Sequence, residues 1–400
     1  MYSEHKRLAF EESTPKGPDT RYFVQPEWKS VRPQLTLSAQ PAQNGGLVAA
    51  SSSPWRRPGF ARVVASALVA ARFLPIWLAT GILALVAAII APGALQSTSW
   101  AFVLPYMTIL AVAALGQMLV IMHAGIDLST PAVMFFGGNL IVGVGSGSNS
   151  RLAVAILACL ALGAGVGLTN GILVGVLRLN PLIVTLAVGQ IFLAWGVKYS
   201  RGVVAGANVP DGLSSWAAEK PLGISVVFWT GAAIAVAVAL VLRYTAAGRR
   251  FQAVGANPRA AWMAGVHVRM HVVLAYVVAG TLYAGAAVLL AGIRISIDPG
   301  FGAEYLLAPI AAVVIAGASL AGGLASATST WLAALALTLL TQMLRILGLS
   351  TAMQFVVFGA AILVGMLVSG DRVATLLGRV LRPTEPTART ALTSNGTGAK

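Results

Sequence analysis

The chain has 400 residues, of which 57% are hydrophobic and 10% are charged, and its mean hydropathy is +0.82. Because a soluble domain carries about 25% charged residues, this composition excludes an ordinary soluble protein and indicates a protein of the lipid bilayer. The net charge of +15 does not indicate nucleic-acid binding, since the sequence shows no basic face interleaved with aromatic residues and membrane proteins concentrate basic residues in cytoplasmic loops.

The two ends of the chain differ in composition from its middle. Residues 1–72 are rich in Pro, Ser, Gln and Arg, and their first 60 contain no apolar stretch of the kind found in a secretory signal. Polar, charged segments cannot bury enough apolar surface to fold, so we predict a disordered cytoplasmic extension there. Residues 371–400 predict a cytoplasmic C-terminal tail. The transmembrane domain is expected over residues 73–370.

Ten apolar segments lie between these ends. A helix needs about 20 apolar residues to cross the bilayer, so the sequence predicts an all-α, polytopic transmembrane helix bundle of about 8–10 spans. The segments at 131–147 and 305–320 are short and contain glycine, and we expect them to be re-entrant or broken. The others are 74–91, 103–122, 152–177, 181–200, 222–242, 271–292, 324–345 and 352–369.

The basic residues predict the orientation. The segment from Arg243 to Arg269 contains five arginines and no acid, so it should be a cytoplasmic loop. Six predicted spans precede it and four follow. An even number of spans returns the chain to the side from which it started, so both termini are expected on the same cytoplasmic side as this loop. The segments 201–221 and 293–304 are nearly balanced in charge and are expected on the outer face.

Asp127 is the acidic residue that most needs an explanation. It lies between two apolar segments in the sequence Gly125-Ile-Asp-Leu-Ser-Thr-Pro131, and a charge within a bilayer is costly. Ser129 and Thr130 are good helix caps, and Pro131 fits a first helical turn. Asp127 is therefore interpreted either as the cap of a turn or as a residue with a direct transport role, such as proton coupling.

A stripe of glycines indicates a close contact between helices. Gly163, Gly167, Gly171 and Gly175 recur every four residues and would lie on one face of a helix, beside Asn170. Packing against another helix is the simpler interpretation. A moving translocation interface is the alternative.

The basic central loop contains a predicted short helix. Asn257 is a good N-cap, Pro258 fits the first turn and Gly265 can end the helix. Such a helix either presents a rigid surface to a partner protein or lies on the lipid phosphates. It is flanked by Arg249, Arg250, Arg259 and Arg269.

No catalytic, metal or cofactor site is expected. The sequence lacks GxxxxGK[ST], HExxH, CxxC and GxSxG, and its histidines do not cluster at metal-ligand spacing. Its one cysteine, Cys159, lies in an apolar run and is expected to be a packing residue.

Four motifs together resemble one family, the ribose/xylose/galactose-type permeases of bacterial ABC importers. The resemblance covers about residues 74–370. The motifs, in the family's order, are ALGQMLVIMHAGIDLS (114–129), GLTNGILVGVLRLNPLIVTLAVG (167–189), GRRFQAVGANPRAAWMAGV (248–266) and IAAVVIAGASLAGG (310–323).

The resemblance implies roles for particular residues. It implies that the central-loop helix is a cytoplasmic coupling helix that docks into an ATPase subunit, through the segment that includes Arg249, Arg250, Gly255, Asn257, Pro258, Arg259, Ala260 and Gly265. The other motif residues are expected to be structural or to belong to the translocation path: Gly125, Asp127, Ser129, Asn170, Gly171, Asn180, Pro181, Thr185, Gly317, Gly322 and Gly323.

The implied function is import of a monosaccharide across a bacterial inner membrane. The implied partners are an ABC ATPase subunit, a periplasmic or lipid-anchored sugar-binding protein, a second permease copy (identical or a paralogue) and membrane lipid. The permease itself would have no ATPase site and no cofactor. The alternative is an ion-coupled secondary transporter of a small polar solute, which would place carboxylates near the midplane. Asp127, Asp298 and Glu304 are the candidates for that role.

Overall fold

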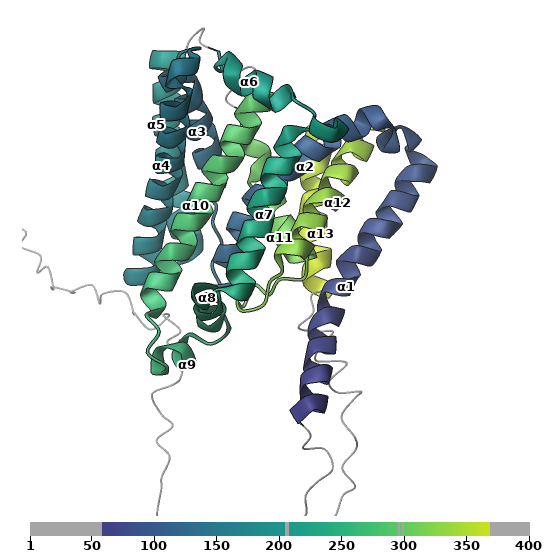
Figure 1. Cartoon of the computed structure of the whole chain (residues 1–400), viewed down its shortest axis with the longest axis vertical. Coiled ribbons are helices and arrows are strands. Elements are labelled where there is room, and N and C mark those ends of the chain that lie inside the picture. The colour runs from purple at the N-terminus through teal and green to yellow at the C-terminus, as the bar shows by residue number, and fades with distance from the viewer. Residues whose placement is uncertain (1–57, 205–207, 295–296, 298–299, 369–400) are drawn as a thin grey trace, which may run out of the picture. The chain divides into compact units, whose positions relative to one another are not determined.

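The structure is a computed structural model that describes residues 58–204, 208–294, 297 and 300–368. These residues belong to one of the two compact units of the chain, Arg57–Lys400; the other unit is Met1–Arg56. The expected C-terminal tail and the first 57 residues of the expected N-terminal extension lie outside the described residues. Every regular element in the described part is helical, which confirms the predicted all-α bundle (Figure 1).

Seven helices in the described part of the chain are long and apolar enough to cross a membrane. Each corresponds to one of the expected segments, and a further helix, α13 (Thr351–Val368), corresponds to the last. The seven are α1 (Pro58–Ile90), α2 (Ser97–Ile121), α4 (Leu152–Gly171), α5 (Pro181–Tyr199), α7 (Val226–Tyr244), α10 (Val268–Ile293) and α12 (Ala327–Ile346).

Two of the ten expected segments form helices that are too short to span the bilayer on their own, so the irregular chain beside each helix must complete the crossing. Helix α3 (Thr130–Gly145) has 16 residues and α11 (Ala308–Ile315) has 8. At 1.5 Å per residue α11 is about 12 Å long, against roughly 30 Å of hydrocarbon. It ends just before Gly317, whose φ of +90° is left-handed and stops a helix. The chain then continues without regular structure to Ser326, where α12 is capped.

Helix α1 begins earlier than the sequence analysis expected. It starts at Pro58, so residues 58–72, which the analysis assigned to the disordered extension, are helical. Residues 60–72 hold Ala, Val and Leu without Gly or Pro, and the proline at position 58 is favourable at a helix start. Arg62 and Arg72 lower the hydropathy of this segment, so its sequence does not read as part of an apolar span.

Helix α2 lies at the centre of the bundle. Most of its side chains are buried, whereas only 11% of the membrane-spanning window is buried in α1 and in α7. A helix that is apolar on all sides is stable only inside a protein or a membrane, and α2 is enclosed by α10, α11, α12 and α7. The helices that carry the functional motifs are therefore built around one buried element.

The glycine stripe of α4 lies against α10, as the packing interpretation predicts. A Cβ atom at Gly167 would collide with the carbonyl oxygen of Tyr276, and one at Gly163 with that of Gly280. The contact is reciprocal, because a Cβ at Gly280 would collide with the carbonyl oxygen of Gly163. The two backbones thus approach as closely as small residues permit.

The two ends of the bundle carry different short elements (Figure 1). Helices α8 (Ala246–Ala256) and α9 (Pro258–Met263) lie at one end, here called the α8–α9 end. Helix α6 (Asp211–Ala218) lies at the other, the α6 end. The end of α10 packs on α6, since a Cβ at Gly292 would lie 3.0 Å from the Cβ of Ala217.

Candidate functional site

Helix α9 is held at both ends by the residues that the sequence predicts. The Asn257 side chain accepts a hydrogen bond from the Ala260 N–H at 3.0 Å, which caps the N-terminus. At the other end the Gly265 N–H donates to Trp262 O and the Val266 N–H donates to Ala261 O. Gly265 has a φ of +79°, so this is a Schellman motif that needs glycine. The predicted short helix is confirmed.

Helix α8, directly before α9, is an element that the sequence analysis did not identify. Thr245 caps it by accepting a hydrogen bond from the Gly248 N–H at 2.9 Å. Its buried side chains, Phe251 and Val254, are three residues apart. This cap and spacing are the signals that could have revealed it.

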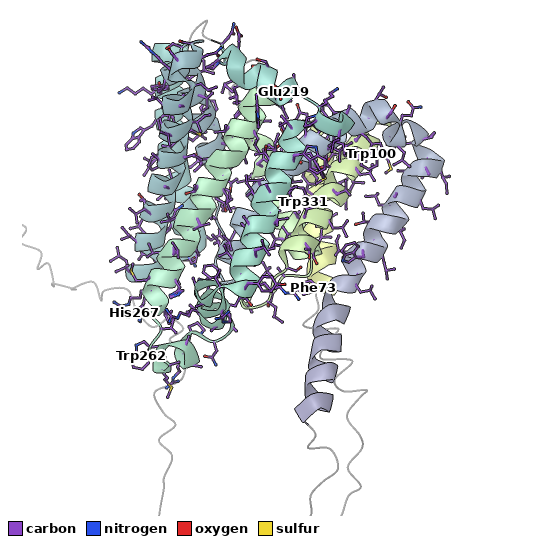
Figure 2. All side chains as sticks on the ribbon, in the orientation of Figure 1. Phe73, Trp100, Glu219, Trp262, His267 and Trp331 are labelled. Carbon is purple, nitrogen blue, oxygen red and sulfur yellow. The ribbon has the colours of Figure 1, made fainter. Side chains whose placement is uncertain are left out.

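Two large apolar side chains of α9 are exposed. Trp262 is 70% exposed and lies beyond the end of the bundle (Figure 2), and Met263 is 77% exposed. Pro258, Arg259 and Ala260 are exposed as well. Because α9 is capped at both ends, it presents these apolar groups on a rigid support. The sequence analysis named the glycines and arginines of this loop but not Trp262 or Met263, although two large apolar residues in a basic loop are a recognisable signal.

Three of the family motifs meet beside α8, at a contact that we call the junction. A Cβ at Gly255, near the end of α8, would collide with the carbonyl oxygen of Met122, which follows α2. The same oxygen accepts a hydrogen bond from the Gly323 N–H at 2.9 Å. A Cβ at Gly322 would lie 3.1 Å from both Met122 O and Gly255 O. The junction thus joins α8, the end of α2 and the loop after α11.

His123 lies next to the junction, outside the spanning helices. Its ring packs on that of Phe251 of α8, with centroids 4.2 Å apart. Both ring nitrogens are buried and have no hydrogen-bond partner among the described residues. Burial, with a smaller effect from the charge of His271, lowers the pKa of His123 to about 4. The ring is therefore neutral near pH 7, as its apolar surroundings require.

Asp127 holds the turn between α2 and α3. It is 1% exposed, and its Oδ1 accepts hydrogen bonds from the Ser129 N–H at 2.9 Å and the Ser129 hydroxyl at 2.6 Å. The Asn170 amide of α4 donates to the Ser129 oxygen at 3.0 Å. Pro131 is in the first turn of α3, as predicted, but the expectation that Ser129 caps α3 with its side chain is wrong, because the hydroxyl donates to Asp127.

The same turn is held from the α5 and α2 sides. The Thr185 hydroxyl donates to Ile126 O at 3.2 Å and accepts from the Leu128 N–H at 3.0 Å. In the amide orientation that satisfies its neighbours, Gln117 donates to Asp127 O at 3.0 Å and accepts from the Asp127 N–H at 3.1 Å. Gly125, Asp127, Ser129, Asn170 and Thr185 therefore form one buried polar cluster.

The turn also has no room for a larger residue at Gly125. A Cβ there would lie 2.5 Å from the hydroxyl oxygen of Tyr276 on α10. This hydroxyl, Asp127 Oδ2 and Asn170 Oδ1 have no hydrogen-bond partner among the described residues. The cluster thus places several polar atoms, some of them without a partner, in the interior of the described part of the bundle.

These contacts predict a structural role for the Asp127 side chain. We expect Asp127→Asn to keep most uptake activity, because the amide oxygen can still accept from the Ser129 N–H. Asp127→Leu leaves the Ser129 groups unpaired and should destabilise the protein by about 1–3 kcal/mol. Thermal unfolding in detergent and solute uptake would be measured for both variants. A loss of uptake in Asp127→Asn with unchanged stability would show instead that the charge takes part in transport.

The remaining predicted site residues have separate positions. A Cβ at Gly171 would lie 2.8 Å from the Cα of Val273, so Gly171 belongs to the contact of α4 with α10. Asn180 caps α5 by accepting from the Leu182 N–H at 2.9 Å, and Pro181 is the first residue of α5. The arginines of α8, Arg249 and Arg250, are exposed. In the described part of the chain no three His, Cys, Asp or Glu residues are placed to hold a metal ion.

Comparison with known families gives a match over most of the chain. Residues 99–367 match a family described as "Branched-chain amino acid transport system / permease component". The match includes every element of the junction and of the polar cluster, and it begins after the end of α1. No solved structure matches the chain.

Curated relatives are sugar and signal-molecule permeases. The chain is 31% identical to the ribose import permease protein of Escherichia coli K12 over 276 residues, 68% of this chain and 85% of the relative. It is 33% identical to the ribose import permease protein of Bacillus subtilis over 294 residues, 73% and 91% of the two chains. It is 32% identical to the autoinducer 2 import system permease protein of Salmonella typhimurium, covering 76% and 88%.

Proposed function

Because the chain belongs to the family of transport-system permease components, we propose that it is the membrane-spanning permease subunit of an ATP-driven ABC importer for a monosaccharide. The relatives named above are import permeases for ribose and autoinducer 2, and a fructose import permease of Rhizobium meliloti is 32% identical. These relatives favour a sugar of the ribose, xylose and galactose class over a branched-chain amino acid, although the family description mentions the latter. The chain is a transport subunit with many membrane-crossing helices.

The observation that carries this proposal is the path of contacts from α9 to the polar cluster. Exposed Trp262 and Met263 suit docking into an ATPase subunit, and α9 is joined to the junction through α8. At the junction Gly255 and Gly323 both contact the carbonyl of Met122, five residues before Asp127. A displacement of α9 would therefore move the backbone of the turn that Asp127 holds.

The proposed mechanism is alternating access. Closure of two ATPase subunits on ATP moves the α8–α9 pairs of two permease copies, and the pathway between the copies then opens to the other side. The energy enters because ATP binds the two conformations with different affinity. ATP is hydrolysed by the separate ATPase subunit, and the permease does no covalent chemistry. A periplasmic or lipid-anchored sugar-binding protein delivers the sugar to the α6 end.

The proposed orientation follows from charge. The α8–α9 end is cytoplasmic, because the segment from Arg243 to Arg269 carries five arginines and no acid. The N- and C-termini lie on the same side, and the protein resides in a bacterial inner membrane. Lipid covers the exposed apolar faces of α1 and α7.

The ion-coupled alternative has less support. Asp127 Oδ1 is bound to Ser129, and Glu304 pairs with Arg294 at 3.2 Å, so each of these two acids already has a partner within the protein. Asp298 lies outside the described residues. The relatives are subunits of import systems, which supports the permease assignment over an independent carrier.

Co-purification tests the proposal directly. We expect the ATPase subunit encoded with this permease to co-purify with the wild type from detergent, and the double variant Trp262→Glu/Met263→Glu to lose at least about 90% of it, since exposed anchors of this type contribute about 1–4 kcal/mol each. Leu222→Glu is the control and should retain the subunit, because Leu222 is an apolar residue at the α6 end that is 89% exposed. Equal binding by all three proteins would refute docking through α9.

A further inference from the structure

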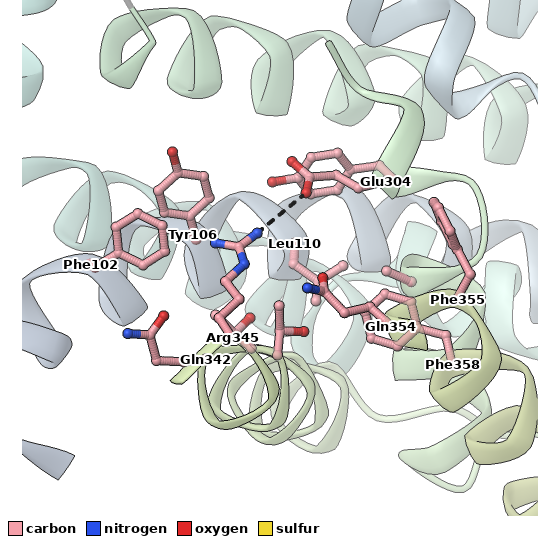
Figure 3. A pocket seen from close by; sticks show the side chains of 13 residues that line it. Phe102, Tyr106, Leu110, Glu304, Gln342, Arg345, Gln354, Phe355 and Phe358 are labelled. Atoms are coloured by element: carbon pink, nitrogen blue, oxygen red, sulfur yellow. Dashed lines mark ion pairs between the residues drawn. The ribbon is translucent and has the colours of Figure 1, made fainter. Parts of the chain in front are cut away.

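A hollow lies at the α6 end of the bundle, far from the junction. Its volume is about 50 Å³, and it lies between α2, α12, α13 and the single turn η6 (Ala303–Tyr305) (Figure 3). Neither the junction nor the polar cluster around Asp127 includes any of its residues. The sequence analysis placed the segment containing η6 on the outer face.

The lining of the hollow combines aromatic rings with uncharged polar groups. Phe102, Phe355 and Phe358 contribute rings, and Gln342 and Gln354 contribute amides (Figure 3). Gln354 is 6% exposed, and its side chain lines the hollow. A buried amide is unfavourable unless a ligand or water completes its hydrogen bonds.

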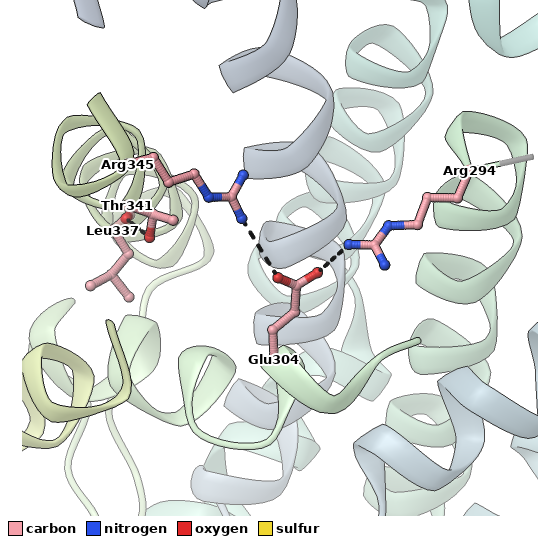
Figure 4. Close-up of polar contacts among 5 residues, drawn as sticks. All are labelled: Arg294, Glu304, Leu337, Thr341 and Arg345. Carbon is pink, nitrogen blue, oxygen red and sulfur yellow. Dashed lines mark hydrogen bonds and ion pairs between the residues drawn. The ribbon is translucent and has the colours of Figure 1, made fainter. Parts of the chain in front are cut away.

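Arg345 and Glu304 line one side of the hollow, and Arg294 pairs with Glu304 from outside the lining. Glu304 lies between the two arginines, with Oε1 at 3.2 Å from Arg294 Nη2 and Oε2 at 4.0 Å from Arg345 Nη2 (Figure 4). The Arg345 guanidinium also lies over the ring of Phe102, 5.6 Å from its centroid. Because Arg294 makes the shorter contact, Glu304 stays paired if Arg345 moves away. An exposed contact as long as that of Arg345 holds a side chain only weakly.

A second, more open cavity adjoins the first. This groove has a volume of about 430 Å³ and shares Phe102, Gln342 and Arg345 with the hollow. Its other lining residues include Thr98 and Ser99, which add hydroxyl groups. The hollow alone is far smaller than the roughly 300–1,000 Å³ of ordinary small-molecule sites. The hollow and groove together reach that range, and in Figure 3 the Arg345 side chain lies between Gln342 and Gln354.

We propose that the hollow and the groove form one binding site for a neutral, polyhydroxylated small molecule, and that Arg345 is the movable partition that admits it. Aromatic faces pack on the C–H surface of such a molecule, while amides and hydroxyls of the site exchange hydrogen bonds with its hydroxyl groups. Both arginines face Glu304, so neither is reserved for an anionic ligand. The proposal rests on the importer function, for which it identifies the place where the sugar enters at the α6 end.

Thiol labelling of the purified full-length permease tests the site without any partner subunit. Gln354→Cys and, separately, Thr341→Cys place a reactive group in the hollow, and the rate of reaction with a small water-soluble methanethiosulfonate is measured. Wild type gives the baseline, because Cys159 is buried. Val356→Cys is the matched control, since Val356 is 64% exposed on the same helix and does not line the hollow.

We expect at least one of D-ribose, D-xylose, D-fructose and D-galactose to slow labelling of both hollow variants and not of Val356→Cys. Adding Arg345→Ala should increase the labelling rate of the hollow variants about two- to fivefold. This factor corresponds to the free energy of a weak surface ion pair, which the substitution removes. Protection by inorganic phosphate alone would overturn the assignment to a neutral ligand. Protection by none of these compounds would overturn the site, and an unchanged rate in Arg345→Ala would overturn the partition.

The two proposals fail in different experiments. Labelling is measured on the permease alone, so absence of sugar protection leaves co-purification of the ATPase subunit unaffected. Loss of the importer function would show as failure of co-purification, whatever the labelling result.

Discussion

Replacement of Gly167 by valine is expected to prevent assembly of the bundle. A Cβ at this position would collide with the carbonyl oxygen of Tyr276 and would lie 2.8 Å from its carbonyl carbon. Overpacking costs about 1–3 kcal/mol where side chains can adjust, and we expect more than about 3 kcal/mol here because only separation of α4 from α10 relieves the collision. The yield of monodisperse protein in detergent and its thermal unfolding measure the effect.

Gly165→Val is the matched control. Gly165 is on the same helix two residues away, and a Cβ there meets nothing within 4 Å. The cost of fixing a valine in a helix is the same at both positions, so the difference between the two variants isolates the contact with α10. Equal loss of both proteins would show that helix propensity, and not the close approach of two backbones, explains the glycine stripe.

The second large effect is expected at Gly255, as a loss of transport without a loss of ATPase binding. A Cβ at Gly255 would collide with the carbonyl oxygen of Met122, so Gly255→Ala should force α8 away from the end of α2. Helix α9 keeps its own caps and its exposed face, and we expect the ATPase subunit still to co-purify. Coupling free energies of about 1–3 kcal/mol correspond to about 5–150-fold, which is the expected fall in ATP-driven uptake.

Ala253→Val is the control for this variant. Ala253 is exposed on the same helix, two residues from Gly255, so added methyl groups there do not reach Met122. Uptake by this control should be near that of wild type. If Gly255→Ala also transports normally, the junction does not transmit motion from α9 to the membrane.

The bundle and its local signals could be predicted from the sequence. Apolar segments of known minimum length identified the long helices of the described chain, and the shortness of two segments distinguished α3 and α11. The caps of α9 followed from Asn257 and Gly265, because these signals act over four to six residues. Such features depend on the chain only locally.

The junction could not be predicted, although its motifs were identified one by one. Met122, Gly255 and Gly323 are far apart in the sequence, and they meet through backbone atoms. Glycine carries no side-chain chemistry that would reveal its partner. The sequence therefore placed these glycines in motifs. Their contacts with the carbonyl of Met122, which explain why glycine is needed, appear only in the three-dimensional structure.

The role of Ser129 shows how a local rule can fail. Serine before a helix predicts a side-chain cap, but a carboxylate two residues earlier offers the hydroxyl a stronger, charge-assisted hydrogen bond. The hollow at the α6 end was missed for another reason. Gln342 and Gln354 are single polar residues within apolar segments, and only their convergence from α12 and α13 makes a site.

Uptake of radiolabelled D-ribose and D-fructose into proteoliposomes tests the central claim most directly. The vesicles contain this permease with the ATPase subunit encoded beside it, and the sugar-binding protein is added outside. The account predicts uptake that requires ATP on the ATPase side, persists when H⁺ and Na⁺ gradients are collapsed, and is lost in Trp262→Glu/Met263→Glu. Uptake that continues without ATP and stops when the ion gradients are collapsed would contradict it and would establish an ion-coupled carrier.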